Sequence, residues 1–221
     1  HRGQFDQAEP LYRAVIKKAP KHFDALHLLG VLEAQRGNPA AALKLFDLSI
    51  KVDPDSAPAY SNRGNALLDL KQPEKALASF DRALRVQRNN PEALNNRGNA
   101  LADLMRYEAA LTSFESALQL KPDYAEALNN RGDVLLKLDR HDEALASCER
   151  ALELRPDYAT AHNNRGNALG HLKRHEEALA GYDRALQYRP DYPEAHNNRG
   201  IVLSDMKRHA EAVASFKRAL Q

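Results

Sequence analysis

Residues 91–124 have the sequence PEALNNRGNALADLMRYEAALTSFESALQLKPDY. In the first half of this stretch, Leu94, Leu101 and Leu104 recur at helical spacing. The pattern breaks at residues 105–107, and a second set of apolar residues at helical spacing follows over residues 110–120. Pro122 ends the second set, because proline cannot continue a helix. The stretch therefore predicts two helices, A and B, joined by a short turn.

The same pattern recurs along the chain with a period of 34 residues. The recurring positions are a glycine (Gly30, Gly64, Gly98, Gly132, Gly166, Gly200), an alanine (Ala8, Ala42, Ala76, Ala110, Ala144, Ala178, Ala212), a mostly aromatic position (Tyr12, Phe46, Phe80, Phe114, Cys148, Tyr182, Phe216) and a proline (Pro20, Pro54, Pro122, Pro156, Pro190). A fixed period of this length indicates one helical hairpin stacked on copies of itself. We expect one array over residues 1–221, with units 1–22 (helix B only), 23–56, 57–90, 91–124, 125–158, 159–192 and 193–221 (incomplete).

The small residues have a packing role in this scheme. We expect Gly98 and Ala110 to lie where helices A and B cross, since only small side chains allow a close approach. Phe114 would then fill the space between the two helices. Cys148 takes the aromatic position of its unit and is expected to be a buried core residue.

These columns resemble the tetratricopeptide repeat (TPR) family over essentially the whole chain. The resemblance implies an all-α, right-handed solenoid of stacked helical hairpins, in which helix A lines a concave groove and helix B faces outward. The chain begins within a repeat and ends before its last repeat is complete, so we expect a piece of a longer protein. Exposed apolar helix faces at such ends would favour end-to-end self-association, because natural arrays cover them with capping repeats.

A column of asparagines precedes the repeated glycine. The four residues ending in that glycine are Asn-Asn-Arg-Gly at 95–98, 129–132, 163–166 and 197–200, and Ser-Asn-Arg-Gly at 61–64. Asparagine is a mediocre helix former, so its recurrence inside a helix calls for another explanation. In the TPR family this helix face is the concave one. We expect the peptide-binding residues there to be Asn62, Asn65, Asn96, Asn99, Asn130, Asn164, Asn167 and Asn198.

Each of these side-chain amides offers a donor and an acceptor, which complement the C=O and N–H of a peptide unit. At the spacing of packed helices, one asparagine would meet about every third residue of an extended peptide. The column is similar to the asparagine ladder that binds peptide backbones in the TPR region of O-GlcNAc transferase and its bacterial relatives. That resemblance raises the alternative of a substrate-recruiting region in a larger protein glycosyltransferase.

An architectural interpretation of the asparagines stays open beside the peptide-binding one. Stacked amides can bond to one another and fix the repeat geometry without any ligand. The lysine clamp of chaperone-binding TPR proteins is not expected here, because the position three before the glycine holds serine or asparagine in the units from residue 57 onward.

The arginine column and the first full unit carry two further predictions. Arginines precede the glycine at Arg63, Arg97, Arg131, Arg165 and Arg199. We expect their stems to cover core and their guanidinium groups to pair with acids such as Asp81, Glu115, Glu149 or Asp183. The first full unit has Leu28 and Val31 where later units carry amides, which gives a hypothetical apolar anchor for a ligand.

Composition narrows the possible functions. The net charge of +2 does not give the basic surface of a nucleic-acid scaffold, and no apolar run reaches the about 20 residues of a membrane-spanning helix. The nine histidines lack a recognised ligand spacing, and those at the turns, His141, His175 and His209, are expected to be solvated. No nucleophile–base or acid–base constellation assembles, so we expect neither catalysis nor a metal or other cofactor. A single cysteine favours a reducing compartment, and we expect a cytoplasmic protein.

Overall fold

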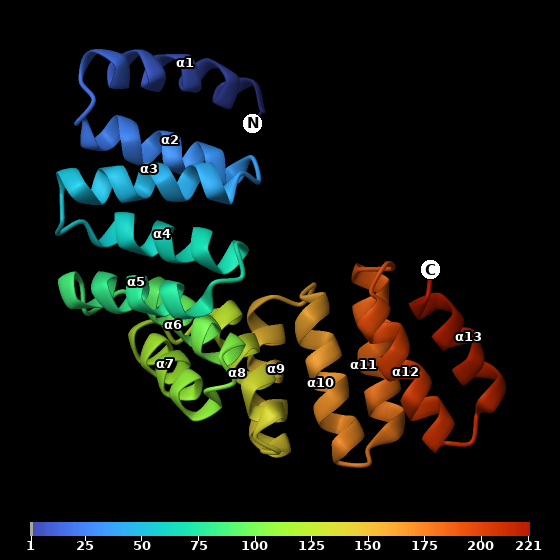
Figure 1. The fold of residues 1–221 in the computed structure, drawn as a ribbon. Coiled ribbons are helices and arrows are strands. Elements are labelled where there is room, and N and C mark those ends of the chain that lie inside the picture. Colours follow the sequence, from blue (N-terminus) through green and yellow to red (C-terminus); the bar gives the residue numbers. More distant parts are fainter. Residues whose placement is uncertain (1) are drawn as a thin grey trace. The chain divides into compact units, whose positions relative to one another are not determined.

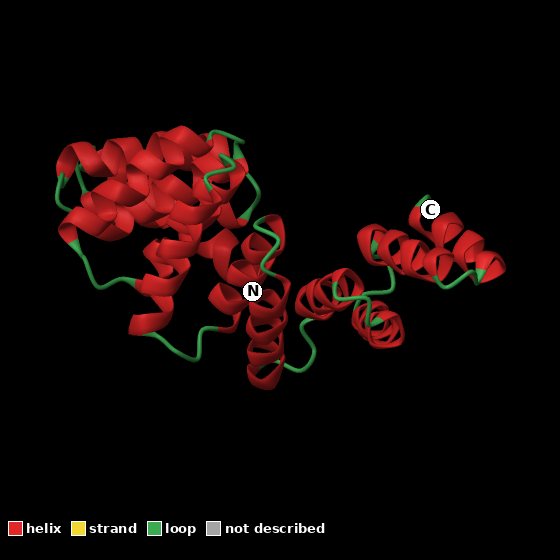
Figure 2. Ribbon diagram, turned by 90° about the horizontal axis from the view of Figure 1, so that it is seen from below, coloured by secondary structure: helices red, strands yellow, loops and turns green. Residues whose placement is uncertain are grey.

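A computed structural model describes residues 2–221, and from residue 8 onward it also describes the side chains. Residues 2–221 form thirteen helices and no strand, so the all-α prediction is confirmed (Figures 1 and 2). The helices are α1 (Arg2–Lys18), α2 (Phe23–Gln35), α3 (Pro39–Val52), α4 (Ala57–Asp69), α5 (Pro73–Val86), α6 (Pro91–Asp103), α7 (Tyr107–Leu120), α8 (Ala125–Lys137), α9 (His141–Leu154), α10 (Ala159–His171), α11 (His175–Tyr188), α12 (Pro193–Asp205) and α13 (His209–Ala219).

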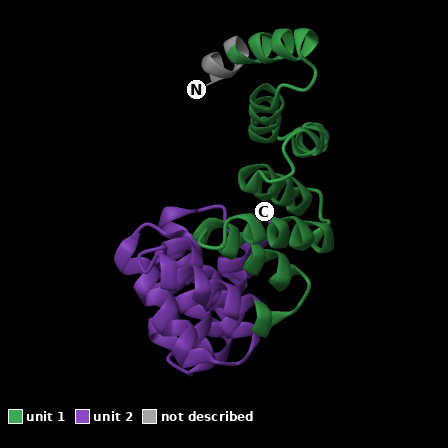
Figure 3. Cartoon of the chain, turned by 90° about the vertical axis from the view of Figure 1, so that its left-hand side faces the viewer, with its two compact units in different colours: residues 1–109 green, residues 110–221 purple. Residues whose placement is uncertain are grey.

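The chain divides into two compact units, residues 1–109 and residues 110–221 (Figure 3). The first unit contains α1–α6 and the start of α7, and the second contains the rest of α7 and α8–α13. Within each unit, consecutive helices pack against one another as antiparallel neighbours (Figure 1).

The pair α4 and α5 illustrates how the sequence sets the helix ends. The Ser56 side chain caps α4 by accepting a hydrogen bond of 3.3 Å from the Ala59 backbone N–H. A three-residue turn follows, in which Lys71 adopts a positive φ of 57°. Pro73 then starts α5 at the first helical position, where its missing N–H costs nothing.

Small residues bring the paired helices together. Beneath Gly64 of α4 lies the ring of Phe80 of α5, so close that a Cβ on Gly64 would come within 2.5 Å of it. Phe80 forms a buried cluster with Leu67, Ala76 and Ala100. The prediction that the repeated glycine lies at the helix crossing is therefore confirmed for this pair.

The helices of each unit fall into two sets. The even-numbered helices, which we call the A-type helices, also contact one another: α2 with α4 and α4 with α6 in the first unit, and α8 with α10 and α10 with α12 in the second. In the described part of each unit, the odd-numbered B-type helices make no comparable contact with each other. The A-type helices therefore share one face in each unit, and the asparagine column lies on these helices.

Candidate functional site

All eight predicted asparagines lie on A-type helices. They are Asn62 and Asn65 on α4, Asn96 and Asn99 on α6, Asn130 on α8, Asn164 and Asn167 on α10, and Asn198 on α12. Asn65 is exposed, and most of the others are half-buried. Asn164 is the exception at 5% exposure.

In the first unit, the amides link successive A-type helices. The Asn96 Nδ2 donates to Asn65 Oδ1 at 2.9 Å, which ties α6 to α4. The Asn62 Nδ2 lies 2.9 Å from His27 Nε2, which ties α4 to α2. Asn95 supports the first link by donating to Asn96 Oδ1 at 3.2 Å.

In the second unit, the amides link three A-type helices in series. The Asn164 Nδ2 donates to Asn129 Oδ1 at 3.2 Å, between α10 and α8. The Asn198 Nδ2 donates to both Asn163 Oδ1 at 3.2 Å and Asn167 Oδ1 at 3.0 Å, between α12 and α10. The buried residues Asn129 and Asn163 were not among the predicted site residues. The doubled Asn-Asn of the sequence is the signal that could have identified them.

The Asn167 amide has a further partner in Tyr182 of α11. The buried Tyr182 hydroxyl donates to Asn167 Oδ1 at 2.9 Å, so this oxygen accepts two hydrogen bonds. Asn198 in turn uses both Nδ2 hydrogens. Within residues 2–221, no hydrogen bond engages Asn167 Nδ2 or Asn198 Oδ1. These two groups stay available as one donor and one acceptor.

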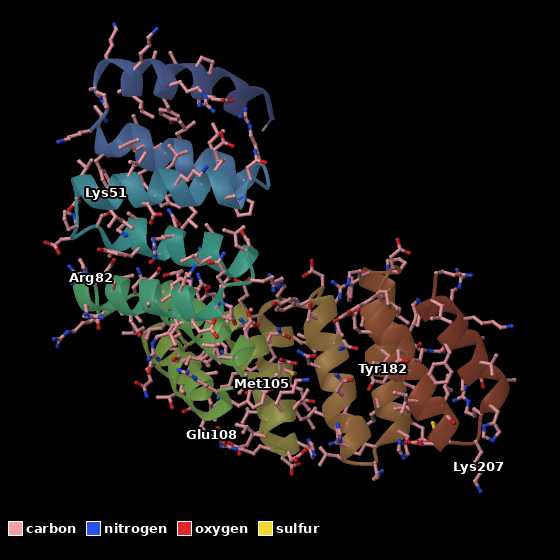
Figure 4. The ribbon with its side chains drawn as sticks, in the orientation of Figure 1. Lys51, Arg82, Met105, Glu108, Tyr182 and Lys207 are labelled. Atoms are coloured by element: carbon pink, nitrogen blue, oxygen red, sulfur yellow. The ribbon has the colours of Figure 1, made fainter. Side chains whose placement is uncertain are left out.

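A pocket of about 470 Å³ opens beside these amides in the second unit. Its lining comes mainly from α8, α10 and α12, and α11 contributes Tyr182. Tyr182 is labelled in Figure 4. The residues used below are Asp133 and Leu136 of α8, Asn167 and Gly170 of α10, and Asn198 and Ile201 of α12. Its size falls within the range of about 300–1,000 Å³ that is typical of small-ligand sites.

The arginine column has the structural role predicted for it. Each arginine pairs with the acid 16 residues earlier: Arg63 with Asp47 (2.7 Å), Arg97 with Asp81 (2.7 Å), Arg131 with Glu115 (3.1 Å), Arg165 with Glu149 (3.2 Å) and Arg199 with Asp183 (2.7 Å). Arg63, Arg131 and Arg199 also donate to the serine 16 residues later, at Ser79, Ser147 and Ser215 respectively. The guanidinium groups are thereby held within the hairpins.

The two residues of the predicted apolar anchor differ in their surroundings. Leu28 of α2 is 43% exposed. Val31 is half-buried and packs against the core cluster of Ala42, Phe46 and Ala66. Leu28 is therefore the member of the pair that presents apolar surface to solvent.

Cys148 and two of the three turn histidines are shielded from solvent to different degrees. Cys148 is fully buried as predicted, and burial raises the pKa of its thiol to about 12. The prediction of solvated turn histidines holds for His209 but is wrong for His141 and His175. Both of these are half-buried, and each has a buried Nδ1 without a hydrogen-bond partner. Among the described side chains, no group of three or more metal-ligating residues comes together.

A tetratricopeptide repeat model matches residues 2–58, 61–125 and 98–159, and a second one matches residues 157–221. No curated protein matches the chain. None of the helices in residues 2–221 combines the length and apolar character needed to span a membrane.

Solved structures resemble it over most of its length. One is a chain of the APC/C hetero-tetramer Cut9–Hcn1, with a TM-score of 0.88 and 17% identity over 99% of this chain and 43% of that chain. This chain thus spans less than half of that protein, and the likeness shows the fold alone. A second is MamA from Desulfovibrio magneticus RS-1, with a TM-score of 0.66 and 29% identity over 74% of this chain and 93% of that chain. A third is YrrB, a TPR protein with an unusual peptide-binding site, with a TM-score of 0.66 and 25% identity over 83% of this chain and 95% of that chain.

Proposed function

This chain belongs to the tetratricopeptide repeat family, and we propose that it is a protein-interaction scaffold that binds extended peptide segments. The contacts would form on the asparagine-bearing face of the A-type helices. Its ligand-binding residues would be the eight predicted asparagines, which would have two different roles. Asn164 is buried and would support the neighbouring helix, while the more exposed amides would contact the peptide.

One observation carries this proposal above all. The network uses the Asn167 acceptor and the Asn198 donors, and it leaves Asn167 Nδ2 and Asn198 Oδ1 without partners in the described chain. One donor and one acceptor on neighbouring amides match the C=O and N–H of one residue in an extended peptide, which point to the same side of the chain. The peptide-binding site in the name of the similar protein YrrB supports the same class of function.

The amide contacts favour backbone recognition over side-chain recognition. Every peptide unit presents the same C=O and N–H, so such a face would hold many sequences along one path. Hydrogen bonds of this kind contribute about 0.5–1.5 kcal/mol each, so useful affinity requires several of them. We therefore expect weak, broad binding that increases with peptide length.

The test is binding of a random peptide library to the parent protein and to a variant that combines Asn96→Ala, Asn130→Ala and Asn198→Ala. Asn197→Ala with Asn89→Ala is the matched control, because both of these asparagines are exposed and lie outside the predicted set. We expect the triple variant to lose binding and the control to keep it, with helicity by circular dichroism unchanged in both. Peptide binding by the triple variant that equals binding by the parent protein would contradict the proposal.

A second candidate function is architectural, and the amide-to-amide hydrogen bonds between A-type helices favour it. In that case the asparagines fix the spacing of successive hairpins and no peptide is bound there. The same triple variant separates the two candidates, because an architectural ladder predicts a loss of stability with no peptide binding in the parent. Self-association through the ends of the array belongs to this alternative, and sedimentation would detect it.

The resemblance to O-GlcNAc transferase adds a proposal about a larger protein. Peptide binding by this region would then recruit substrates to a glycosyltransferase domain elsewhere in that protein, and the scaffold itself would not be catalytic. A glycosyltransferase assay of the protein purified from its native source would test this proposal. We also propose that the scaffold acts in the cytoplasm, where a reducing environment suits its single cysteine.

A further inference from the structure

The pocket of the second unit contains one carboxylate in the asparagine column. The residue after the repeated glycine is asparagine at Asn65, Asn99 and Asn167, and it is Asp133 in the unit between the last two. Asp133 lies in the middle of α8, and its side chain lines the pocket. This column position therefore carries a negative charge in the pocket, where Asn65, Asn99 and Asn167 have a neutral amide.

The Asp133 carboxylate has no charged partner of its own. In the described part of the chain, neither a hydrogen bond nor an ion pair engages it. Burial raises the pKa of Asp133, and the charge of Lys137, one helical turn away, opposes that shift. A partly desolvated carboxylate of this kind is stabilised by an approaching cation, because the cation replaces lost hydration.

The other charges on the pocket wall lie at the helix ends. Lys137, Lys173 and Asp205 are exposed residues at or just beyond the ends of α8, α10 and α12. His171 also lines the wall, and desolvation together with the His141 charge lowers its pKa, so that it is neutral near pH 7. Asp133, by contrast, lies in the interior of α8, on one of the helices that carry the asparagines.

Two residues particular to this region shape the pocket. Tyr182 takes a position that is phenylalanine in four other units, and its hydroxyl orients the Asn167 amide. Gly170 stands where the equivalent residues are Ala34, Leu68, Ala102, Leu136 and Ser204. The missing side chain at Gly170 leaves room beside the Tyr182 hydroxyl, which a Cβ there would approach to 3.8 Å.

We propose that this pocket, formed by Asp133, Leu136, Asn167, Gly170, Asn198 and Ile201, binds one basic residue of an extended peptide. The lysine ammonium or arginine guanidinium donates to the Asp133 carboxylate. Its aliphatic stem lies against Leu136 and the exposed Ile201. A neighbouring residue of the extended peptide, whose own C=O and N–H point to the same side of the chain, accepts from Asn167 Nδ2 and donates to Asn198 Oδ1.

This inference rests on the proposed peptide-binding function and adds a side-chain preference to it. Backbone recognition alone gives equal affinity for all sequences, whereas the half-buried Asp133 carboxylate discriminates by charge. A charge-assisted hydrogen bond of this type corresponds to a preference of about 10-fold to 100-fold.

The test uses fluorescence anisotropy with peptides of about 12 residues, which span about 40 Å when extended. They are built from alanine, serine and threonine, with one central residue that is lysine, arginine, norleucine or glutamate. We expect the parent protein to bind the lysine and arginine peptides about 10-fold to 100-fold more tightly than the norleucine peptide. Norleucine has the apolar stem without the charge, so this comparison isolates the cation.

The decisive variant is Asp133→Asn, which places the amide of the equivalent positions into this unit and is therefore expected to fold. It should remove the preference for basic residues while the norleucine peptide binds as before. Asp139→Asn is the matched control, because it changes the net charge equally at a side chain that is 90% exposed. That control should keep the preference.

The possible failures are distinguishable. If the parent protein binds all four peptides equally, or if Asp205→Asn removes the preference and Asp133→Asn does not, this inference is wrong and the proposed function stands. If the parent protein binds none of them and none of the random library, the proposed function fails and this inference fails with it. Helicity and melting temperature of each variant exclude unfolding as the cause.

Discussion

Gly166 of α10 faces the ring of Tyr182 of α11 so closely that a Cβ on Gly166 would lie 2.6 Å from Tyr182 Cε1. Four residues further along the same helix, Gly170 has ordinary space, because a Cβ there would meet Val202 Cγ2 at 3.6 Å. The two glycines therefore have different reasons for being glycine. One keeps two helices together, and the other leaves a pocket open.

This difference gives a paired prediction for stability. Gly166→Ala should lower the free energy of unfolding by about 1–3 kcal/mol, because the buried ring cannot move without repacking the core. Gly170→Ala should raise it by about 0.5–1 kcal/mol, because alanine loses less backbone entropy in a helix. Urea unfolding followed by circular dichroism measures both. Equal changes in the free energy of unfolding for Gly166→Ala and Gly170→Ala would contradict the packing described for the two glycines.

The aromatic column supplies a second prediction. Phe114 is 0% exposed, and Phe114→Ala should cost about 3–5 kcal/mol of unfolding free energy through the lost contacts and the remaining cavity. Leu220→Ala is the control, since Leu220 is 88% exposed and should change stability by about 0.5 kcal/mol or less. A loss under about 1 kcal/mol at Phe114 would be the size of a surface change and would refute its core role.

The helical hairpins could be predicted because each depends on residue types with a local effect. Pro73 and Pro91 mark helix starts, and the glycine and aromatic columns mark the crossing of two helices. The arginine pairs could be predicted for a similar reason. A long side chain on a packed face needs an acid within reach, and Asp81 and Asp183 stood at the right spacing.

The amide network and the pocket could not be predicted in the same way. Asn198 could donate to Asn163, to Asn167 or to a ligand, depending on how α12 packs against α10. The residue pattern does not determine that packing. Asp133 differs from the asparagines at the equivalent positions by one charge, and this difference alone does not indicate a pocket. The pocket beside it is formed by residues of several helices, whose packing is a property of the folded chain.

The turns between paired helices give a third prediction. Gly37 has a φ of +77°, and the equivalent residues Lys71, Met105, Asp139, Lys173 and Lys207 have φ values of 56° to 61°. A left-handed conformation costs a non-glycine residue about 1–2 kcal/mol. Met105→Gly removes this cost but adds the larger backbone entropy that glycine loses on folding. The net effect should be an increase in the free energy of unfolding of about 0.5–1 kcal/mol.

Two further substitutions control the turn prediction. Met105→Ala keeps the backbone cost and should leave the stability nearly unchanged. Gly37→Ala should lower stability by about 1 kcal/mol or more, purely through the backbone, since a Cβ on Gly37 would meet nothing within 4 Å. Stabilisation by Met105→Ala equal to that of Met105→Gly would show that backbone strain is not the cause.

His27 of the first unit gives the last prediction, which concerns pH. Its Nε2 lies 2.9 Å from Asn62 Nδ2, and its ring packs at 5.8 Å, centroid to centroid, from Phe46. Desolvation lowers the pKa of His27, and the nearby Asp24 charge opposes this only in part. Asn62 Nδ2 can donate to Nε2 only while that nitrogen is unprotonated, which agrees with a neutral ring in the folded protein.

A histidine whose pKa is lower in the folded than in the unfolded chain binds more protons when unfolded. Its contribution to stability is therefore present above the unfolded pKa of about 6.5 and is lost as the pH falls toward the folded pKa. We expect the melting temperature to fall between about pH 7.5 and about pH 5.5, and we expect His27→Gln to reduce that fall. Glutamine keeps a hydrogen-bonding group toward Asn62 but cannot take up a proton. His162 and His171 also have lowered pKa values, so part of the dependence should persist in the variant. An unchanged dependence in His27→Gln would show that protonation of this ring does not oppose folding.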